Sequence, residues 1–190
     1  MDQELEFQIS EIFPSLIIKK DISDCITDDI LSTFDNIVEN MSEKVPLSES
    51  FSSRGEMNSI LDLSAFENLK DHLVKSILQF CLQQYQVNRL DLAESFAIHI
   101  PKDGYYEIRK NYDCSFNLLI NLSSSSNIVL HNPIYLTKSL DYDVQISNKY
   151  NSQYSFIPFN QYEAMIIPSG IYYGFPKREE ELKLITSIIR

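Results

Sequence analysis

Apolar residues in the first half of the chain recur at helical spacing. One stripe repeats every three or four residues over 26–41, after Ser23 or Asp24, either of which can cap a helix. A second stripe runs over 66–86, and the capping-box pattern Ser64-Ala65-Phe66-Glu67 marks its start. The pattern therefore predicts two helices, separated by a polar loop over 45–58.

Short β-rich runs replace this pattern after residue 93. One earlier run, over 12–18, contains Pro14 and reads as an edge strand. The later expected strands are 94–101, 105–109, 115–122, 127–130, 153–158, 162–168, 171–175 and 182–189. Strand-helix alternation is missing, so a doubly wound parallel sheet is not expected. The pattern predicts an α+β, mainly β chain in which two N-terminal helices pack on one sheet of a jelly roll.

The length of 190 residues suits one domain over 1–190. Within it, we expect 1–93 to supply an opening strand and supporting helices, and 94–190 to form the jelly-roll core. The link 123–126, four serines in a row, is expected to be a flexible hairpin tip.

The net charge and the lack of long apolar runs limit the classes of partner that we expect. A net charge of −11, without a basic stripe, is unsuited to phosphate binding, so no nucleic acid partner is expected. No apolar run approaches the roughly 20 residues that cross a bilayer, and the N-terminus is acidic where a signal peptide would be basic. We therefore expect no membrane association, and a cytoplasmic or virion location.

Few residues offer standard catalytic chemistry. Cys25, Cys81 and Cys114 lie far apart without a CxxC spacing, so free thiols are expected rather than a metal site or disulfides. Phosphate-binding glycine loops, HExxH and GxSxG are absent. The three histidines are His72, His99 and His131, and we expect His72 on the second helix, at the surface or at the boundary of its apolar stripe.

Six fragments resemble a known family through their order and spacing. They are Ile12-Phe13-Pro14-Ser15-Leu16-Ile17, Phe96-Ala97-Ile98-His99-Ile100, Asn117-Leu118-Leu119-Ile120-Asn121-Leu122, Val129-Leu130-His131-Asn132-Pro133, Ile167-Pro168-Ser169-Gly170-Ile171-Tyr172-Tyr173 and Leu184-Ile185-Thr186-Ser187-Ile188-Ile189. Together they resemble the 2-oxoglutarate- and iron(II)-dependent oxygenases, in particular a small bacterial and phage branch. The resemblance implies a double-stranded β-helix, which is a form of jelly roll.

The sequence differs from this family at the positions that would bind the metal and the cosubstrate. Such an enzyme holds iron with two histidines and one carboxylate. The resemblance places these ligands at Arg109, Asn111 and Tyr173, and the cosubstrate-binding arginine at Leu184, next to Lys183. A guanidinium has no lone pair to offer, and an amide or phenol is a weak ligand. The ligand and cosubstrate positions are therefore predicted to be degenerate, with no metal and no cofactor.

Three functions follow as alternatives. The main prediction is a non-catalytic, oxygenase-like jelly-roll protein that binds protein partners as a subunit of a homo- or hetero-oligomeric assembly, with a phage particle as one setting. The second is an active iron- and 2-oxoglutarate-dependent hydroxylase with a rearranged site built from His99, His131 and either Glu107 or Asp113. The third is a module for small organic acids, in which Arg109 holds the anion.

Overall fold

The computed structural model describes residues 8–12, 15–42, 53–54, 57–61, 66–109, 114–132 and 154–190. Its strands are β1 (Gln8–Ile12), β2 (Ser15–Asp21), β3 (Ser53–Arg54), β4 (Met57–Ile60), β5 (Leu92–Ile100), β6 (Tyr105–Arg109), β7 (Phe116–Asn121), β8 (Ser126–His131), β9 (Tyr154–Phe159), β10 (Glu163–Pro168), β11 (Tyr172–Phe175) and β12 (Leu182–Ile189). They form a seven-stranded sheet, ordered β1-β2-β10-β7-β12-β5-β4, and a five-stranded sheet, ordered β3-β6-β11-β8-β9. Every strand pairing is antiparallel.

The opening strand differs from the prediction. The structure has two strands there, β1 and β2, which pair antiparallel with Ile12 opposite Ser15. Pro14, the predicted edge residue, lies outside the described residues. β1 is the edge strand, whereas β2 lies inside the sheet between β1 and β10.

The first helix, α1 (Asp28–Ser42), begins later than predicted. Ser23–Cys25 forms a separate 3-10 turn, so neither Ser23 nor Asp24 caps α1. The hydroxyl of Thr27 instead accepts a hydrogen bond from the backbone N–H of Ile30, at 3.4 Å. Two acids in the first turn, Asp28 and Asp29, complement the positive end of the helix dipole.

The second helical stretch is continuous but not uniform. It comprises α2 (Glu67–His72), a π-helical segment (Leu73–Leu78) and α3 (Gln79–Tyr85). Gln86 ends it in a left-handed conformation with φ 53°, in agreement with the predicted end. Ser64 and Ala65 of the predicted capping box lie outside the described residues.

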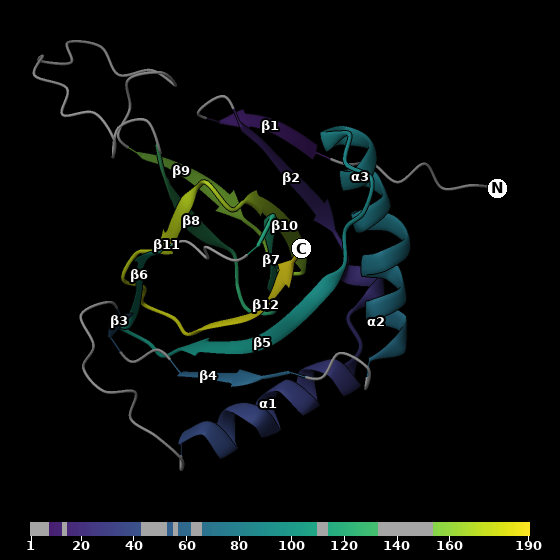
Figure 1. Ribbon diagram of the computed structural model, residues 1–190. Coiled ribbons are helices and arrows are strands. Elements are labelled where there is room, and N and C mark those ends of the chain that lie inside the picture. Colours follow the sequence, from purple (N-terminus) through teal and green to yellow (C-terminus); the bar gives the residue numbers. More distant parts are fainter. Residues whose placement is uncertain are drawn as a thin grey trace, which may run out of the picture.

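Both helical stretches cover one face of the seven-stranded sheet (Figure 1). Buried residues of the helices, such as Phe34 and Leu73, share one cluster with Ala97, Leu118 and Ile185 of the sheet. We call this side of the sheet the helix face. The prediction of helices packed on one sheet is confirmed.

The other face of the seven-stranded sheet packs against the five-stranded sheet. The cluster between them takes Leu119, Met165 and Leu184 from the larger sheet and Leu130 and Phe175 from the smaller. We call this space the interior. A mainly β chain with two stacked antiparallel sheets and few helices is consistent with the predicted jelly roll.

Two local predictions are wrong. The expected loop over 45–58 contains β3 and the first half of β4, which pair with β6 and β5. The link 123–126 is not a hairpin tip, because β7 and β8 belong to different sheets. This link therefore carries the chain from one sheet to the other.

Among the helices of the described residues, none is long and apolar enough to cross a membrane.

Candidate functional site

One end of the five-stranded sheet gathers several predicted site residues. Tyr173 on β11 lies directly opposite Arg109 on β6, and its neighbour Tyr172 lies opposite His131 on β8. The expected approach of Arg109 and Tyr173 is therefore present in the backbone register. Asn111 and Asp113 lie outside the described residues, as do the side chains of Glu107 and Arg109.

Tyr173 points into the interior. Its side chain is 1% exposed and belongs to the cluster between the sheets. Its ring stacks on Tyr106 with centroids 6.1 Å apart, and Tyr106 makes an edge contact with Phe175 at 6.0 Å. Aromatic rings thus occupy the interior at the position where the resemblance would place a metal-binding histidine.

The two candidates for the cosubstrate position lie on opposite faces of β12. Leu184 is buried in the interior, whereas Lys183 is half-buried and contacts Asp35 of α1, with 2.8 Å between Nζ and Oδ1. This is the alternation expected of neighbouring strand residues. Lys183 therefore does not replace the missing arginine inside the sandwich.

His99 lies on the helix face of β5, so its side chain does not face the interior. Ala97, two residues before it, belongs to the helix-face cluster, while Ile98 and Ile100 belong to the interior. The Nε2 atom of His99 lies 3.0 Å from Oε2 of Glu181. The seven-stranded sheet separates this imidazole from the interior.

His131 lies on the outer face of the five-stranded sheet. Leu130 before it is in the interior, and the ring of His131 contacts that of the exposed Tyr154, with centroids 5.3 Å apart. Burial lowers the pKa of this imidazole, which favours the neutral form. The predicted combination of His99 with His131 is therefore wrong, because the two histidines lie on opposite outer faces of the sandwich.

Thr186 is an interior polar group that sequence reasoning missed. It shares the face of Leu182 and Leu184, is 6% exposed, and has no hydrogen-bond partner for Oγ1 among the described residues. A buried hydroxyl without a partner costs about 1–3 kcal/mol, so a bound molecule could satisfy it. The alternation of side chains along β12 could have revealed it, because Thr186 is the polar residue that follows Leu182 and Leu184 on the inward-facing side.

A further interior feature is the ion pair of Lys19 and Glu163, whose Nζ and Oε1 are 2.8 Å apart and almost fully buried. It joins β2 to β10 near the sheet edge. Among the described residues, no position gathers three or more histidine, cysteine, aspartate or glutamate side chains suited to a metal ion.

Comparisons with solved structures place the fold among the 2-oxoglutarate and iron(II) oxygenases. A prolyl-4-hydroxylase from Pseudomonas putida matches with TM-score 0.60 and 12% identity over 98% of this chain and 93% of its own. The viral collagen prolyl hydroxylase from Paramecium Bursaria Chlorella virus-1, solved with 2-oxoglutarate, matches with TM-score 0.55 and 10% identity, covering 90% and 95%. HygX from Streptomyces hygroscopicus, solved with nickel and 2-oxoglutarate, matches with TM-score 0.56 and 9% identity, covering 91% and 82%. No protein-family model and no curated protein matches the sequence.

These matches confirm, at the level of the fold, the resemblance to this oxygenase family. They contradict the main functional prediction of a non-catalytic, cofactor-free subunit. The neighbours are oxygenases, and two of them hold 2-oxoglutarate in their structures. The second prediction, an oxygenase with a rearranged metal site, agrees better with these findings.

Proposed function

We propose that this chain is a 2-oxoglutarate- and iron(II)-dependent oxygenase of double-stranded β-helix fold, with a rearranged metal site. The observation that carries the proposal is the match of nearly the whole chain to two prolyl hydroxylases, one of them solved with 2-oxoglutarate, and to HygX, solved with nickel and 2-oxoglutarate. Identity of 8–12% leaves the substrate open.

The path of the chain supports the double-stranded β-helix. From β5 to β8, successive strands alternate between the larger and the smaller sheet, and β10, β11 and β12 do so again. The larger sheet thereby places β12 between β5 and β7, and the smaller sheet places β11 between β6 and β8. Each sheet contains strands from widely separated parts of the sequence, as a jelly roll requires.

The described residues do not fit the usual two-histidine, one-carboxylate iron site. Tyr173 fills the interior at one expected ligand position, and His99 is on the wrong face. His131 remains as the histidine at the same end of the smaller sheet as Arg109 and Tyr173. We therefore place the rearranged site on the outer face of the smaller sheet, where His131 lies, with Glu107 and Asp113 as the carboxylates to be tested.

Metal binding and cosubstrate turnover test this proposal together. Under anaerobic conditions, Fe(II) titration should give one ion per chain, and aerobic incubation with 2-oxoglutarate should release succinate. His131→Gln should weaken iron binding by at least about tenfold, because it removes a direct ligand. Loss of a residue that only hydrogen-bonds to a metal ligand already weakens metal binding by about that factor. Glu107→Gln and Asp113→Asn identify the carboxylate in the same assay.

His99→Gln is the matched control. Glutamine can keep a hydrogen bond to Glu181, and the position faces the helices, so iron affinity should equal that of the unaltered protein. Folding of each variant is checked by circular dichroism. The proposal is wrong if the unaltered protein neither retains iron nor consumes 2-oxoglutarate, or if His131→Gln and His99→Gln behave alike.

A further inference from the structure

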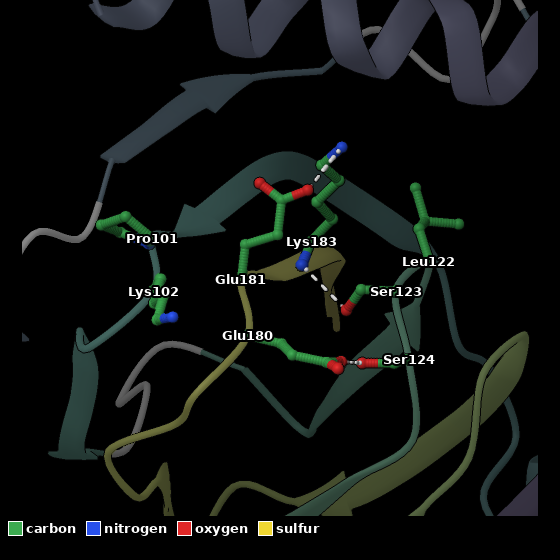
Figure 2. A pocket seen from close by; sticks show the side chains of 8 residues that line it. All are labelled: Pro101, Lys102, Leu122, Ser123, Ser124, Glu180, Glu181 and Lys183. Atoms are coloured by element: carbon green, nitrogen blue, oxygen red, sulfur yellow. Dashed lines mark hydrogen bonds and ion pairs between the residues drawn. The ribbon is translucent and has the colours of Figure 1, made fainter.

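A separate pocket lies at the opposite end of the sandwich from Tyr173 and His131. Its volume is about 600 Å³, within the range of small-molecule sites. Three links form it: the β5–β6 turn, the β7–β8 crossing and the segment that leads into β12. The lining residues are Pro101, Lys102, Leu122, Ser123, Ser124, Glu180, Glu181 and Lys183, as Figure 2 shows.

The pocket is built on an ordered polar framework. The backbone N–H of Leu122 donates to the carbonyl of Lys183 at 2.9 Å, and the N–H of Lys183 donates to Oγ of Ser123 at 3.1 Å. Ser123 in turn donates to Oδ1 of the fully buried Asn121, at 2.9 Å. These bonds fix two of the three links relative to each other, so the hydroxyls of the lining are held in place.

Two of the four charged lining residues already neutralise one another. The Nζ atom of Lys183 lies 3.0 Å from Glu181 and 2.8 Å from Asp35, and these carboxylates raise its pKa. The carboxylate of Glu181 also contacts His99, and hydrogen bonds from Lys183 and His99 outweigh desolvation and lower its pKa. Neither side chain therefore carries a charge that a ligand must compensate.

The other two charges remain available. Lys102 makes no hydrogen bond or ion pair with another described residue, and it sits on the β5–β6 turn. Glu180 accepts a hydrogen bond from the hydroxyl of Ser124 and has no ion pair within the described part of the chain. Arg178 interacts electrostatically with Glu180, but the two side chains form no ion pair. The Arg178 guanidinium instead donates hydrogen bonds to the carbonyl and hydroxyl of Ser124 and to the carbonyl of Ser125.

We propose that this pocket binds a free α-amino acid, with Lys102 holding the carboxylate and Glu180 holding the ammonium group. One cation and one anion, on different links of a pocket with no other uncompensated lining charge, match a zwitterion. A ligand with a single charge could pair with only one of these two groups. The hydroxyls of Ser123 and Ser124 already donate to Asn121 and Glu180, so each can accept a hydrogen bond from the ammonium group of the same ligand.

This site is independent of the proposed oxygenase chemistry. Leu122 and Lys183 face away from the interior, and the seven-stranded sheet lies between them and Leu184. Amino acid binding can therefore fail while iron and 2-oxoglutarate bind, and the reverse can also occur.

Calorimetric titration with each of the twenty L-amino acids, up to millimolar concentrations, tests the proposal on the full chain. At least one amino acid should bind, whereas its decarboxylated amine and its deaminated acid should bind at least about tenfold more weakly, because each loses one charge-assisted contact. Lys102→Gln and Glu180→Gln should each weaken binding by a similar factor. Both side chains are exposed, so neither change should impair folding.

Lys75→Gln is the control, since Lys75 is an exposed lysine on the second helical stretch, outside the pocket. It should leave amino acid affinity unchanged. The proposal is refuted if no amino acid binds, if the amine or the acid alone binds as tightly, or if neither pocket variant weakens binding.

Discussion

Cys81 shows how burial alone changes the chemistry of one side chain. It lies on α3, is fully buried in the helix-face cluster, and is one of three free cysteines. Burial raises the pKa of its thiol to about 12, from an ordinary value near 9. The thiolate is therefore available only in the unfolded chain at moderately alkaline pH.

This difference makes stability depend on pH. Above about pH 9 the unfolded chain loses the Cys81 proton while the folded chain keeps it, so the free energy of unfolding falls as pH rises. The limiting slope is about 1.4 kcal/mol per pH unit, up to the folded pKa. Urea unfolding at pH 8 and pH 10.5 should show this loss, and Cys81→Ala should reduce it. An equal loss in both proteins would contradict the assignment.

The residue scale also shows what the sequence could and could not predict. The family resemblance assigned Arg109 and Tyr173 to one site, and the strand register places the two residues opposite each other. The orientation of His99 was not predicted. Ala97, Ile98, His99 and Ile100 are all buried, since β5 is covered on both faces, and such a run gives no alternation to separate the two sides.

At the scale of elements, α1 depends on a few anchors. Ile30 and Phe34 are buried against the sheet one turn apart, while Asp35 and Asn36 between the apolar positions are exposed. The helix contacts β4 and β5, and Asp35 adds the ion pair to Lys183. Loss of one anchor should therefore loosen the whole helix from the helix face.

Phe34→Ala tests this dependence. Removing a ring that is 2% exposed should lower the free energy of unfolding by about 3–5 kcal/mol, because transfer and cavity terms add. Asn36→Ala, on the exposed side of the same helix, should change it by less than about 0.5 kcal/mol. Chemical denaturation followed by circular dichroism measures both, and similar effects would show that α1 contributes little packing.

Strands with an apolar, β-rich pattern were predicted well, and polar strands were not. The eight later strands were found within two residues of their expected bounds. β3 and β4 were missed because their segment is short and polar, and its strand geometry comes from pairing with β6 and β5 rather than from local preference. Helix α1 was placed too early because Ser23 and Asp24 are good caps that here lie within a separate 3-10 turn.

At the scale of the whole molecule, the last strand completes the larger sheet. β12 lies between β5 and β7, and it pairs with both over nearly its full length. β7 is buried at all six positions, whereas β9 is an edge strand whose Tyr154 and Phe156 are exposed. Central strands can open only when the sandwich opens, while an edge strand can detach by itself.

Hydrogen exchange should reproduce this order. Backbone amides of β7 and β12 should exchange with free energies close to that of global unfolding, and those of β9 should exchange by local opening at lower cost. Mass spectrometry of peptides covering 116–121, 182–189 and 154–159 measures the three strands in one experiment. Equal protection of β9 and β7 would mean that the two sheets unfold as a single unit.

Because β5 and β12 are about 90 residues apart in sequence, their pairing requires a long loop closure, and protection of both should appear together during refolding.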